Sequence, residues 1–501
     1  MCGLVMQTDY FMRIFTTTRE RLIRAGSLML LALAAALFCL PSAARAEDQQ
    51  QPAVFSAKQL SQAAELRDLA LSSADAFRHV ASLTMEVGPR LPGTTGDKAA
   101  VAWALATMRE LGLQNVRAED VMVPHWERGE IEVGITMPYP QTLAATALGG
   151  SIGTPAGGIE APVIRVTDLD ELAATPAAEV AGRIVFFDRR MQASRDGADY
   201  SLTVKARKDG PAKAAAKGAI AVIIRSVGTS SNRLPHTGKT TYDDAIRRIP
   251  AAAISNPDAD MLATQLARGE AVTVKMTISA RYLADERSAN VIGEIRGAGR
   301  PDEIVLLAAH LDSWDLGTGA IDDAAGVGIV LETAAQIIRS GKKPARTIRV
   351  LLAADEESGQ SGGKAYGEKY MADLHKHVVG MEADFGDGKV WRISTLFPED
   401  RLEIASAIHA LLEPLGIEMG DNETGNGADL SEFKKLGMPV ISLGQDGTDY
   451  FDYHHTANDT LDKVDPDNLR QVVAAFVTTT WLAASGDVDF GFREPEEETK
   501  P

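Results

Sequence analysis

Cysteine is almost absent from this chain. Its 501 residues include two cysteines, Cys2 and Cys39. Both lie in an N-terminal segment that we expect to be removed, so the remaining protein would contain none. This excludes disulfide bonds, thiolate nucleophiles and cysteine-ligated zinc or iron–sulfur sites. Any metal ion would have to be held by His, Asp and Glu side chains.

Aromatic residues and positive charges are also scarce. Phe, Trp and Tyr make up 6% of the chain, and 51 Lys and Arg stand against 69 Asp and Glu, a formal net charge of −18. We expect no nucleic-acid partner for so acidic a chain. A hydrophobic content of 45% is ordinary for a globular protein, and the length implies two or three domains.

One long hydrophobic run is present, the 13 residues 28–40. It is too short to span a membrane comfortably, it follows several arginines, and it precedes Ala44-Arg45-Ala46. This pattern predicts a signal peptide over residues 1–46, cleaved after Ala46, with Met12 as an alternative start. The protein would then be periplasmic or secreted and free of the membrane. An uncleaved N-terminal anchor is the alternative.

The rest of the chain changes character twice. Residues 47–118 are predicted as an N-terminal helical part of a catalytic domain, and residues 119–285, with short β-like runs and long loops, as an inserted domain. Over 286–490, apolar strands alternate with helices, which is typical of an α/β domain. The acidic end, 491–501, is predicted to be disordered.

Acidic residues and histidines gather where the predicted strands of the α/β part end. Each segment alone has an ordinary explanation, such as a helix N-terminus or a hydrogen-bonded histidine. Their recurrence at successive strand ends, where open α/β sheets carry their function, favours one shared metal site. The segments are His310-Leu311-Asp312, Asp322-Asp323, Asp355-Glu356-Glu357, Glu382-Ala383-Asp384 and His454-His455.

Without thiolates, such a site needs imidazole and carboxylate ligands, which suit zinc. Two zinc ions about 3.5–4 Å apart can hold a water between them, with one carboxylate bridging the pair. A further carboxylate must take the proton of that water. Asp312 shares a strand face with His310 and could orient it, while Glu356 and Glu357 could divide the remaining roles.

These motifs, in this order, resemble the co-catalytic di-zinc exopeptidases of metallopeptidase family 28. The resemblance covers residues 75–485. It is carried by 310–315 (His-Leu-Asp-Ser-Trp-Asp), 319–323 (Gly-Ala-Ile-Asp-Asp), 124–130, 151–155, 235–238 and 454–456. It implies a mixed central sheet flanked by helices, an inserted β-rich protease-associated domain at 119–285, two Zn²⁺ ions and a homodimer.

The same resemblance implies residue roles. The metal ligands would be His310 and Asp384 for one zinc, Glu357 and His455 for the other, and Asp322 as the bridge. It also implies that the Asp322–Asp323 peptide can be cis. The catalytic residues would be Glu356 as general base, Asp312 behind His310, and His454 as a donor to the scissile carbonyl or the oxyanion.

Several choices stay open. Glu382 competes with Asp384 as a ligand, and His454 with His455. Asp355 would add negative charge beside Glu356 and could raise the pKa of that base. Asp429 is either part of a specificity wall or a helix N-cap. His125 and His236 could reach the substrate cleft, and the remaining histidines, His79, His375, His377 and His409, have no functional context.

The predicted function is a secreted or periplasmic di-zinc exopeptidase. Its substrates would be dipeptides or short peptides with free ends, attacked by the water held between the metals. Two alternatives share the fold: a single-zinc acyltransferase of the glutaminyl cyclase type, and a non-catalytic binding protein. The intact set of ligands and base disfavours the binding protein, and the insertion disfavours the cyclase type.

Overall fold

The computed structural model describes residues 54–424 and 427–495. The predicted signal peptide and the last six residues of the predicted acidic tail lie outside this part of the chain. Within it, no helix combines the length and the apolar character needed to cross a membrane.

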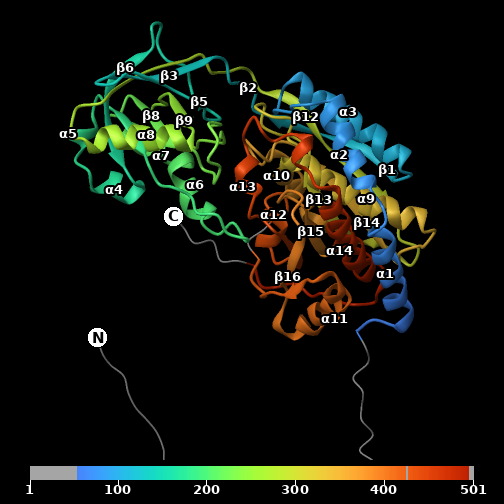
Figure 1. Cartoon of the computed structure of the whole chain (residues 1–501). Helices are drawn as coiled ribbons and strands as arrows, with labels where there is room; N and C mark the ends of the chain where they lie inside the picture. The colour runs from blue at the N-terminus through green and yellow to red at the C-terminus, as the bar shows by residue number, and fades with distance from the viewer. Residues whose placement is uncertain (1–53, 425–426, 496–501) are drawn as a thin grey trace, which may run out of the picture. The chain divides into compact units, whose positions relative to one another are not determined.

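Two eight-stranded sheets organise the described residues (Figure 1). The first has the order β1-β12-β14-β13-β15-β18-β16-β17. Its four middle strands, β14, β13, β15 and β18, are parallel, and β1, β12 and β16 join antiparallel. Its strands are β1 (Gln114–Val123), β12 (Glu286–Ile295), β13 (Arg300–His310), β14 (Arg346–Ala353), β15 (His377–Glu382), β16 (Val390–Leu396), β17 (Glu418–Met419) and β18 (Val440–Gln445).

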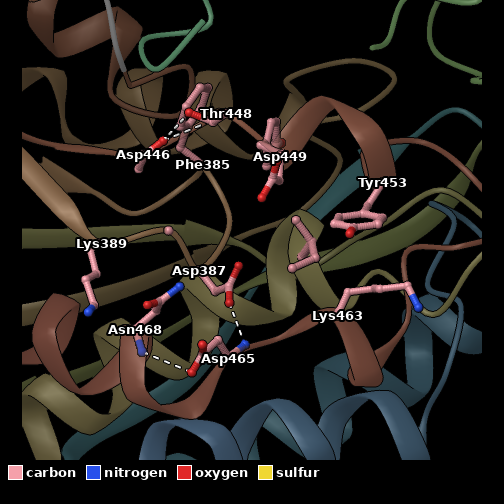
Figure 2. Close-up of a pocket in the computed structure, with 13 residues that line it drawn as sticks. Phe385, Asp387, Lys389, Asp446, Thr448, Asp449, Tyr453, Lys463, Asp465 and Asn468 are labelled. Carbon is pink, nitrogen blue, oxygen red and sulfur yellow. Dashed lines mark hydrogen bonds between the residues drawn. The ribbon is translucent and has the colours of Figure 1, made fainter. Parts of the chain in front are cut away.

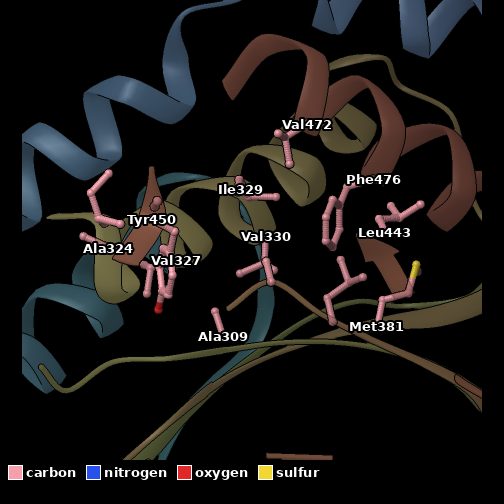
Figure 3. Packing of buried hydrophobic residues seen from close by; sticks show 14 of the residues in the cluster. Ala309, Ala324, Val327, Ile329, Val330, Met381, Leu443, Tyr450, Val472 and Phe476 are labelled. Atoms are coloured by element: carbon pink, nitrogen blue, oxygen red, sulfur yellow. The ribbon is translucent and has the colours of Figure 1, made fainter. Parts of the chain in front are cut away.

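Helices cover both faces of this first sheet. Strand β13 alternates, with Val305, Leu307 and Ala309 in one hydrophobic cluster and Leu306 and Ala308 in another. Figure 3 shows Val330 of α9 and Phe476 of α14 facing the strand residues Ala309 and Met381. The helices are α1 (Ala57–Ala70), α2 (Asp75–Glu86), α3 (Thr95–Glu110), α9 (Ala325–Arg339), α10 (Ser361–Tyr370), α11 (Leu402–Leu412), α12 (Ser431–Lys435), α13 (Tyr450–Tyr453) and α14 (Pro466–Ser485). Burial on both faces explains why β13 and β14 are nearly continuous apolar runs.

The second sheet lies between β1 and β12 in the chain and has the order β4-β3-β10-β6-β7-β8-β9-β5. Its strands are β3 (Ile131–Met137), β4 (Gln141–Leu143), β5 (Ala145–Ala147), β6 (Ile159–Val166), β7 (Ile184–Phe187), β8 (Ala221–Arg225), β9 (Ala251–Ile254) and β10 (Thr273–Ile278). Its helices are α4 (Leu169–Ala174), α5 (Ala177–Val180), α6 (Tyr200–Lys208), α7 (Gly210–Ala216) and α8 (Asn256–Ala267). A short pair, β2 (Trp126–Glu127) and β11 (Arg281–Tyr282), stands where the chain enters and leaves this domain.

One boundary differs from the sequence prediction. Residues 119–123 were assigned to the insertion, but they belong to β1, which pairs with β12 in the first sheet. The strand also takes residues 114–118 from the segment predicted as helical. Its outer half is largely exposed, so it lacks the apolar run that marked the other strands, and its partner lies more than 160 residues away in the sequence.

The parallel strands bring the functional segments to one edge. His310 ends β13, Ala353 ends β14 and Glu382 ends β15, and the register pairs His310 with Ala353 and Ala308 with Glu382. The side chains at and after these strand ends therefore meet, although His310 and Asp384 are 74 residues apart in the sequence. The Asp322–Asp323 peptide before α9 is cis, as the family resemblance implied.

His377, at the start of β15, gives the fold a dependence on pH. Its ring is buried, Nε2 lies 2.8 Å from the Tyr366 hydroxyl and Nδ1 lies 3.1 Å from the Asp373 carbonyl, so the neutral ring can satisfy both. Burial lowers the pKa of His377 to about 4.

We expect the free energy of unfolding to decrease as the pH is lowered from 6.5 to about 4. In this range the unfolded chain binds a proton at His377 that the folded chain does not bind. The loss is at most about 1.4 kcal/mol per pH unit. His377→Gln should remove this part of the slope in urea unfolding, whereas His375→Gln, at an exposed position two residues away, should keep it. Equal slopes in wild type and His377→Gln would contradict the expectation.

Candidate active site

The predicted ligands come together around Asp322. Its Oδ1 lies 3.1 Å from His310 Nε2, and its Oδ2 lies 3.2 Å from His455 Nε2. Asp384 Oδ1 is 3.4 Å from the same nitrogen of His310, and Glu357 Oε2 is 3.0 Å from that of His455. The structure therefore forms two groups of N and O donors that share one carboxylate, the arrangement that a bridged pair of metal ions requires.

A cavity of about 510 Å³ opens onto these groups. It is lined from the first sheet by Asp322, Glu356, Glu357, Asp384, His454 and His455, and from the inserted domain by Tyr200, Arg207, Lys208 and Lys239. A second cavity, of about 540 Å³, shares Phe385 and Tyr450 with it (Figure 2). Asp387, Asp465 and Lys389 line that second cavity, which contains none of the predicted site residues.

Asp312 ties two strand ends together. Its carboxylate accepts the backbone N–H groups of Glu356 (3.0 Å) and Glu357 (3.2 Å), and lies 3.5 Å from His310 Nδ1. Asp312 lies beside His310, as expected from the sequence. Its contact with the backbone of Glu356 and Glu357 was not expected. Glu356 lines the cavity, and its side chain contacts Gln360 Nε2 at 3.5 Å.

The geometry separates Glu382 from Asp384, whereas His454 and His455 both lie near Asp322 and differ in their distance from it. Glu382 turns away and accepts the backbone N–H groups of Asp429 (3.4 Å) and Leu430 (3.2 Å), whereas Asp384 faces His310. His454 Nε2 is 3.7 Å from Asp322 Oδ2, farther than His455 Nε2, and its ring stacks on that of His455 with centroids 3.5 Å apart. Burial and the neighbouring His455 lower the pKa of His454 well below its ordinary value, so the ring is neutral.

The electrostatics of the site call for added positive charge. Burial, followed by nearby carboxylates such as Asp384, raises the pKa of Glu356 well above its ordinary value, and burial with Asp322 raises that of Glu357 to about 7 despite His455. Burial would also raise the pKa of Asp322, but hydrogen bonds from His310 and His455 hold it well below its ordinary value.

These residues fit zinc. Buried carboxylates outnumber the two imidazoles, and Oε1 of Glu357 is buried with no hydrogen-bond partner among the described residues. A divalent cation would supply the missing charge, and imidazole with carboxylate is a donor set that zinc accepts.

Two residues that support the site were not identified from the sequence. Arg90 is fully buried and donates to the carbonyls of Leu311 (2.7 Å), Thr318 (2.7 Å), Gly319 (3.0 Å) and Gly88 (3.1 Å). It therefore joins the loop after His310 to the loop before Asp322. Asp459 accepts the N–H groups of Ile321 (2.6 Å) and Asp322 (3.3 Å). In the sequence, only its position four residues after His455 indicates that Asp459 lies near the site.

The other residues considered from the sequence fall outside the ligand groups. Asp355 accepts the hydroxyls of Ser358 and Ser361, and the main causes of the raised pKa of Glu356 are burial, Asp384, Glu357 and Asp312 rather than Asp355. Asp429 is buried beside Glu382, and neither of its carboxylate oxygens has a hydrogen-bond partner among the described residues. The N-cap of α12 is Leu430, so the N-cap interpretation of Asp429 was wrong. His236 is buried behind His454, whereas His125 lines none of these cavities.

A mixed sheet whose parallel strands carry these carboxylates and histidines at their carboxyl ends is typical of a metallopeptidase. The sequence model of Peptidase family M28 matches residues 290–480, and that of the PA domain matches residues 154–262. Carboxypeptidase Q of Rattus norvegicus is 35% identical over 408 residues, 81% of this chain and 85% of that protein. Carboxypeptidase Q of Mus musculus is 34% identical over 411 residues, 82% of this chain and 86% of that protein. The chain belongs to peptidase family M28 and carries a PA domain inserted in its peptidase domain.

A solved structure supports the same assignment. The crystal structure of a peptidase M28 precursor from Shewanella amazonensis is 44% identical, with a TM-score of 0.86, and the match covers 88% of this chain and 99% of that one. The zinc aminopeptidase BSAP of Bacillus subtilis, 21% identical with a TM-score of 0.60, shares the fold over 85% of this chain and 98% of its own. The predicted family, the α/β fold with its insertion and the class of zinc-dependent exopeptidase are confirmed.

Arg90→Met should destabilise the protein and weaken its zinc binding. The substitution leaves several buried carbonyls without a donor, and each unsatisfied group costs about 1–3 kcal/mol. We expect a loss of at least about 3 kcal/mol in the free energy of unfolding, together with a lower zinc content, measured by chemical unfolding and metal analysis. Arg78→Met, at an exposed arginine of α2, is the control. Wild-type stability in Arg90→Met would refute the role of Arg90.

Proposed function

We propose that this protein is a di-zinc exopeptidase that hydrolyses dipeptides or other short peptides with free ends. The observation that carries the proposal is the placement of Asp322, whose two oxygens face His310 and His455 separately. His310 and Asp384 would hold one zinc, Glu357 and His455 the other, and Asp322 both.

The zinc ions, when bound, would polarise the scissile carbonyl and lower the pKa of the attacking water. Glu356, held by the bond from its backbone N–H to Asp312, takes the proton of that water on its carboxylate and returns it to the leaving amine. The neutral ring of His454 lines the cavity beside Asp322 and would donate to the carbonyl oxygen as negative charge develops there.

The part of the cavity that the inserted domain lines is suited to binding the free C-terminus of a peptide. Lys208 of α6 and Lys239 line it, and neither has an ion-pair partner among the described residues. A substrate carboxylate would meet these two ammonium groups while the scissile bond faces Glu356. This supports action on short peptides, in keeping with relatives named carboxypeptidase Q and aminopeptidase.

We further propose, from the family resemblance and the predicted signal peptide, a homodimer located in the periplasm or secreted. The mass of the protein in solution and the N-terminus of the protein isolated from cells test these two points. A monomer in solution would contradict the homodimer. A protein that still carries residues 1–46 would contradict the cleaved signal peptide.

Glu356→Gln should abolish turnover while leaving the metal bound. The amide keeps the shape of the side chain but cannot take up the proton, so we expect kcat to fall by about 10²–10⁴-fold. Hydrolysis of a dipeptide panel and zinc per chain, measured on the same samples, test this. Glu368→Gln, at an exposed position of α10, is the control and should retain full activity.

The outcomes separate the alternatives. About two zinc ions with hydrolysis that depends on Glu356 supports the proposal. One zinc without hydrolysis favours the cyclase-type acyltransferase, and no metal at all favours a binding protein. Full activity in Glu356→Gln would remove the general-base assignment.

Lys239→Met should raise KM for dipeptides with a free carboxylate by about tenfold, which corresponds to about 1.4 kcal/mol. The same variant should leave KM unchanged for the matching C-terminal amides, because these lack the charge that Lys239 would bind. Lys205→Met, on the exposed side of α6 and outside the cavity, is the matched control. An equal change in KM for the free acids and the amides would show that Lys239 does not bind the substrate carboxylate.

A further inference from the structure

Glu357, one of the proposed ligands, is held by a residue embedded in the inserted domain. Trp314 Nε1 donates to Glu357 Oε2 at 2.6 Å. The indole of Trp314 belongs to the hydrophobic cluster of the inserted domain, with Ala147 and Ile223, although Trp314 itself follows β13. It also lies so close to Gly149 that a Cβ there would come within 2.0 Å of Trp314 Cη2. The insertion therefore determines where the indole N–H points.

His455, the partner ligand, contacts the insertion directly. The Thr237 N–H donates to the His455 carbonyl at 3.0 Å, and the Thr237 carbonyl lies 3.2 Å from His455 Nδ1. Arg207 Nη1 also lies 3.3 Å from Nδ1. In the tautomer whose Nδ1–H donates to the Thr237 carbonyl, Nε2 has the lone pair, and it is Nε2 that faces Asp322 and Glu357. His455 has a positive φ of 63°, so its backbone depends on such support.

Thr237 is itself fixed inside the insertion. It is fully buried, its hydroxyl donates to the Ala147 carbonyl at 3.0 Å, and Arg128 Nη1 donates to that hydroxyl at 2.9 Å. Arg207 Nη1 donates to the Thr237 carbonyl at 3.3 Å. The guanidinium of Arg207 packs against Gly238, where a Cβ would come within 2.3 Å of Arg207 Cζ. The segment that holds His455 thus has few alternative positions.

The other pair of proposed ligands, His310 and Asp384, has no polar contact with the inserted domain among the described residues. The polar partners of His310 in the described part of the chain are Asp312, Asp322, Asp323 and Asp384. All of them belong to the strand ends and loops of the first sheet.

We propose that the inserted domain is an integral part of one metal site and not of the other: Trp314 and Thr237 are positioning residues for Glu357 and His455, whereas the first sheet alone builds the His310–Asp384 site. The inference rests on the proposed assignment of the ligands. It implies that disturbing these contacts lowers the affinity for one zinc ion and spares the other.

Trp314→Phe tests this because it keeps a large apolar ring and removes the indole N–H. Zinc affinity, measured by competition with a chromophoric chelator, should show one site weakened by roughly 10–100-fold and one unchanged. Trp126→Phe is the matched control. Trp126 lies in the same cluster, edge-to-face with Trp314, but its Nε1 donates to the Ser151 carbonyl at 2.8 Å.

A second pair of variants guards against a simple folding defect. Thr237→Val removes the hydroxyl that anchors the segment beneath His455 and should weaken the same site. Thr240→Val removes another buried hydroxyl, which donates to the Gly149 carbonyl at 2.8 Å, and should leave both sites intact. Thermal unfolding of the zinc-free proteins shows whether each pair is equally folded.

The location of the weakened site is tested in ligand variants. In a His455→Ala background, Trp314→Phe should not change the affinity of the remaining zinc, whereas in a His310→Ala background it should reduce it. Equal weakening of both sites, or no weakening in Trp314→Phe, would overturn the inference. A wild-type protein that does not bind two zinc ions would instead overturn the proposed function.

Discussion

Negative charge buried at the carboxyl ends of the parallel strands of the first sheet is the constraint on which the rest of this structure depends. Asp322, Asp323, Glu357 and Asp384 lie within or against the interior around two imidazoles. Burying unpaired charge is costly, so the residues around these acids matter for stability. The buried guanidinium of Arg90 joins the two loops, and His310 and His455 face the shared carboxylate. Asp312, a further buried carboxylate, accepts the backbone N–H groups of Glu356 and Glu357.

The inserted domain serves two purposes on the same cavity. Its basic side chains, Lys208 and Lys239, stand opposite the acidic edge of the first sheet and give the cavity one cationic wall. Its interior meanwhile holds Trp314 and presents Thr237 to His455. If the proposed ligands and function are correct, an insertion that lines the cavity and contacts a ligand would couple substrate specificity to metal affinity. Changes selected for one would be felt by the other.

Much of the site was predictable because its chemistry follows strand ends. The segments at 310, 356–357 and 384 each follow an apolar run, and parallel strands bring their carboxyl ends to one edge. Strand β1 and the pinning role of Arg90 were not predictable in the same way. The outer half of β1 has no apolar run, and Arg90 acts on carbonyls more than 200 residues away, which no local pattern records.

By itself, the sequence determined the chemistry available: no cysteine in the body of the chain, histidines and acids in fixed order, and the α/β alternation that brings them together. Only the tertiary structure distinguishes residues that are neighbours in the sequence. Glu382 turned to the backbone of 429–430 while Asp384 faced His310, and His455 rather than His454 came nearer to both Asp322 and Glu357. Residues one or two apart in the sequence carry nearly the same local signal. Which of them reaches a site depends on backbone direction and on contacts with distant segments.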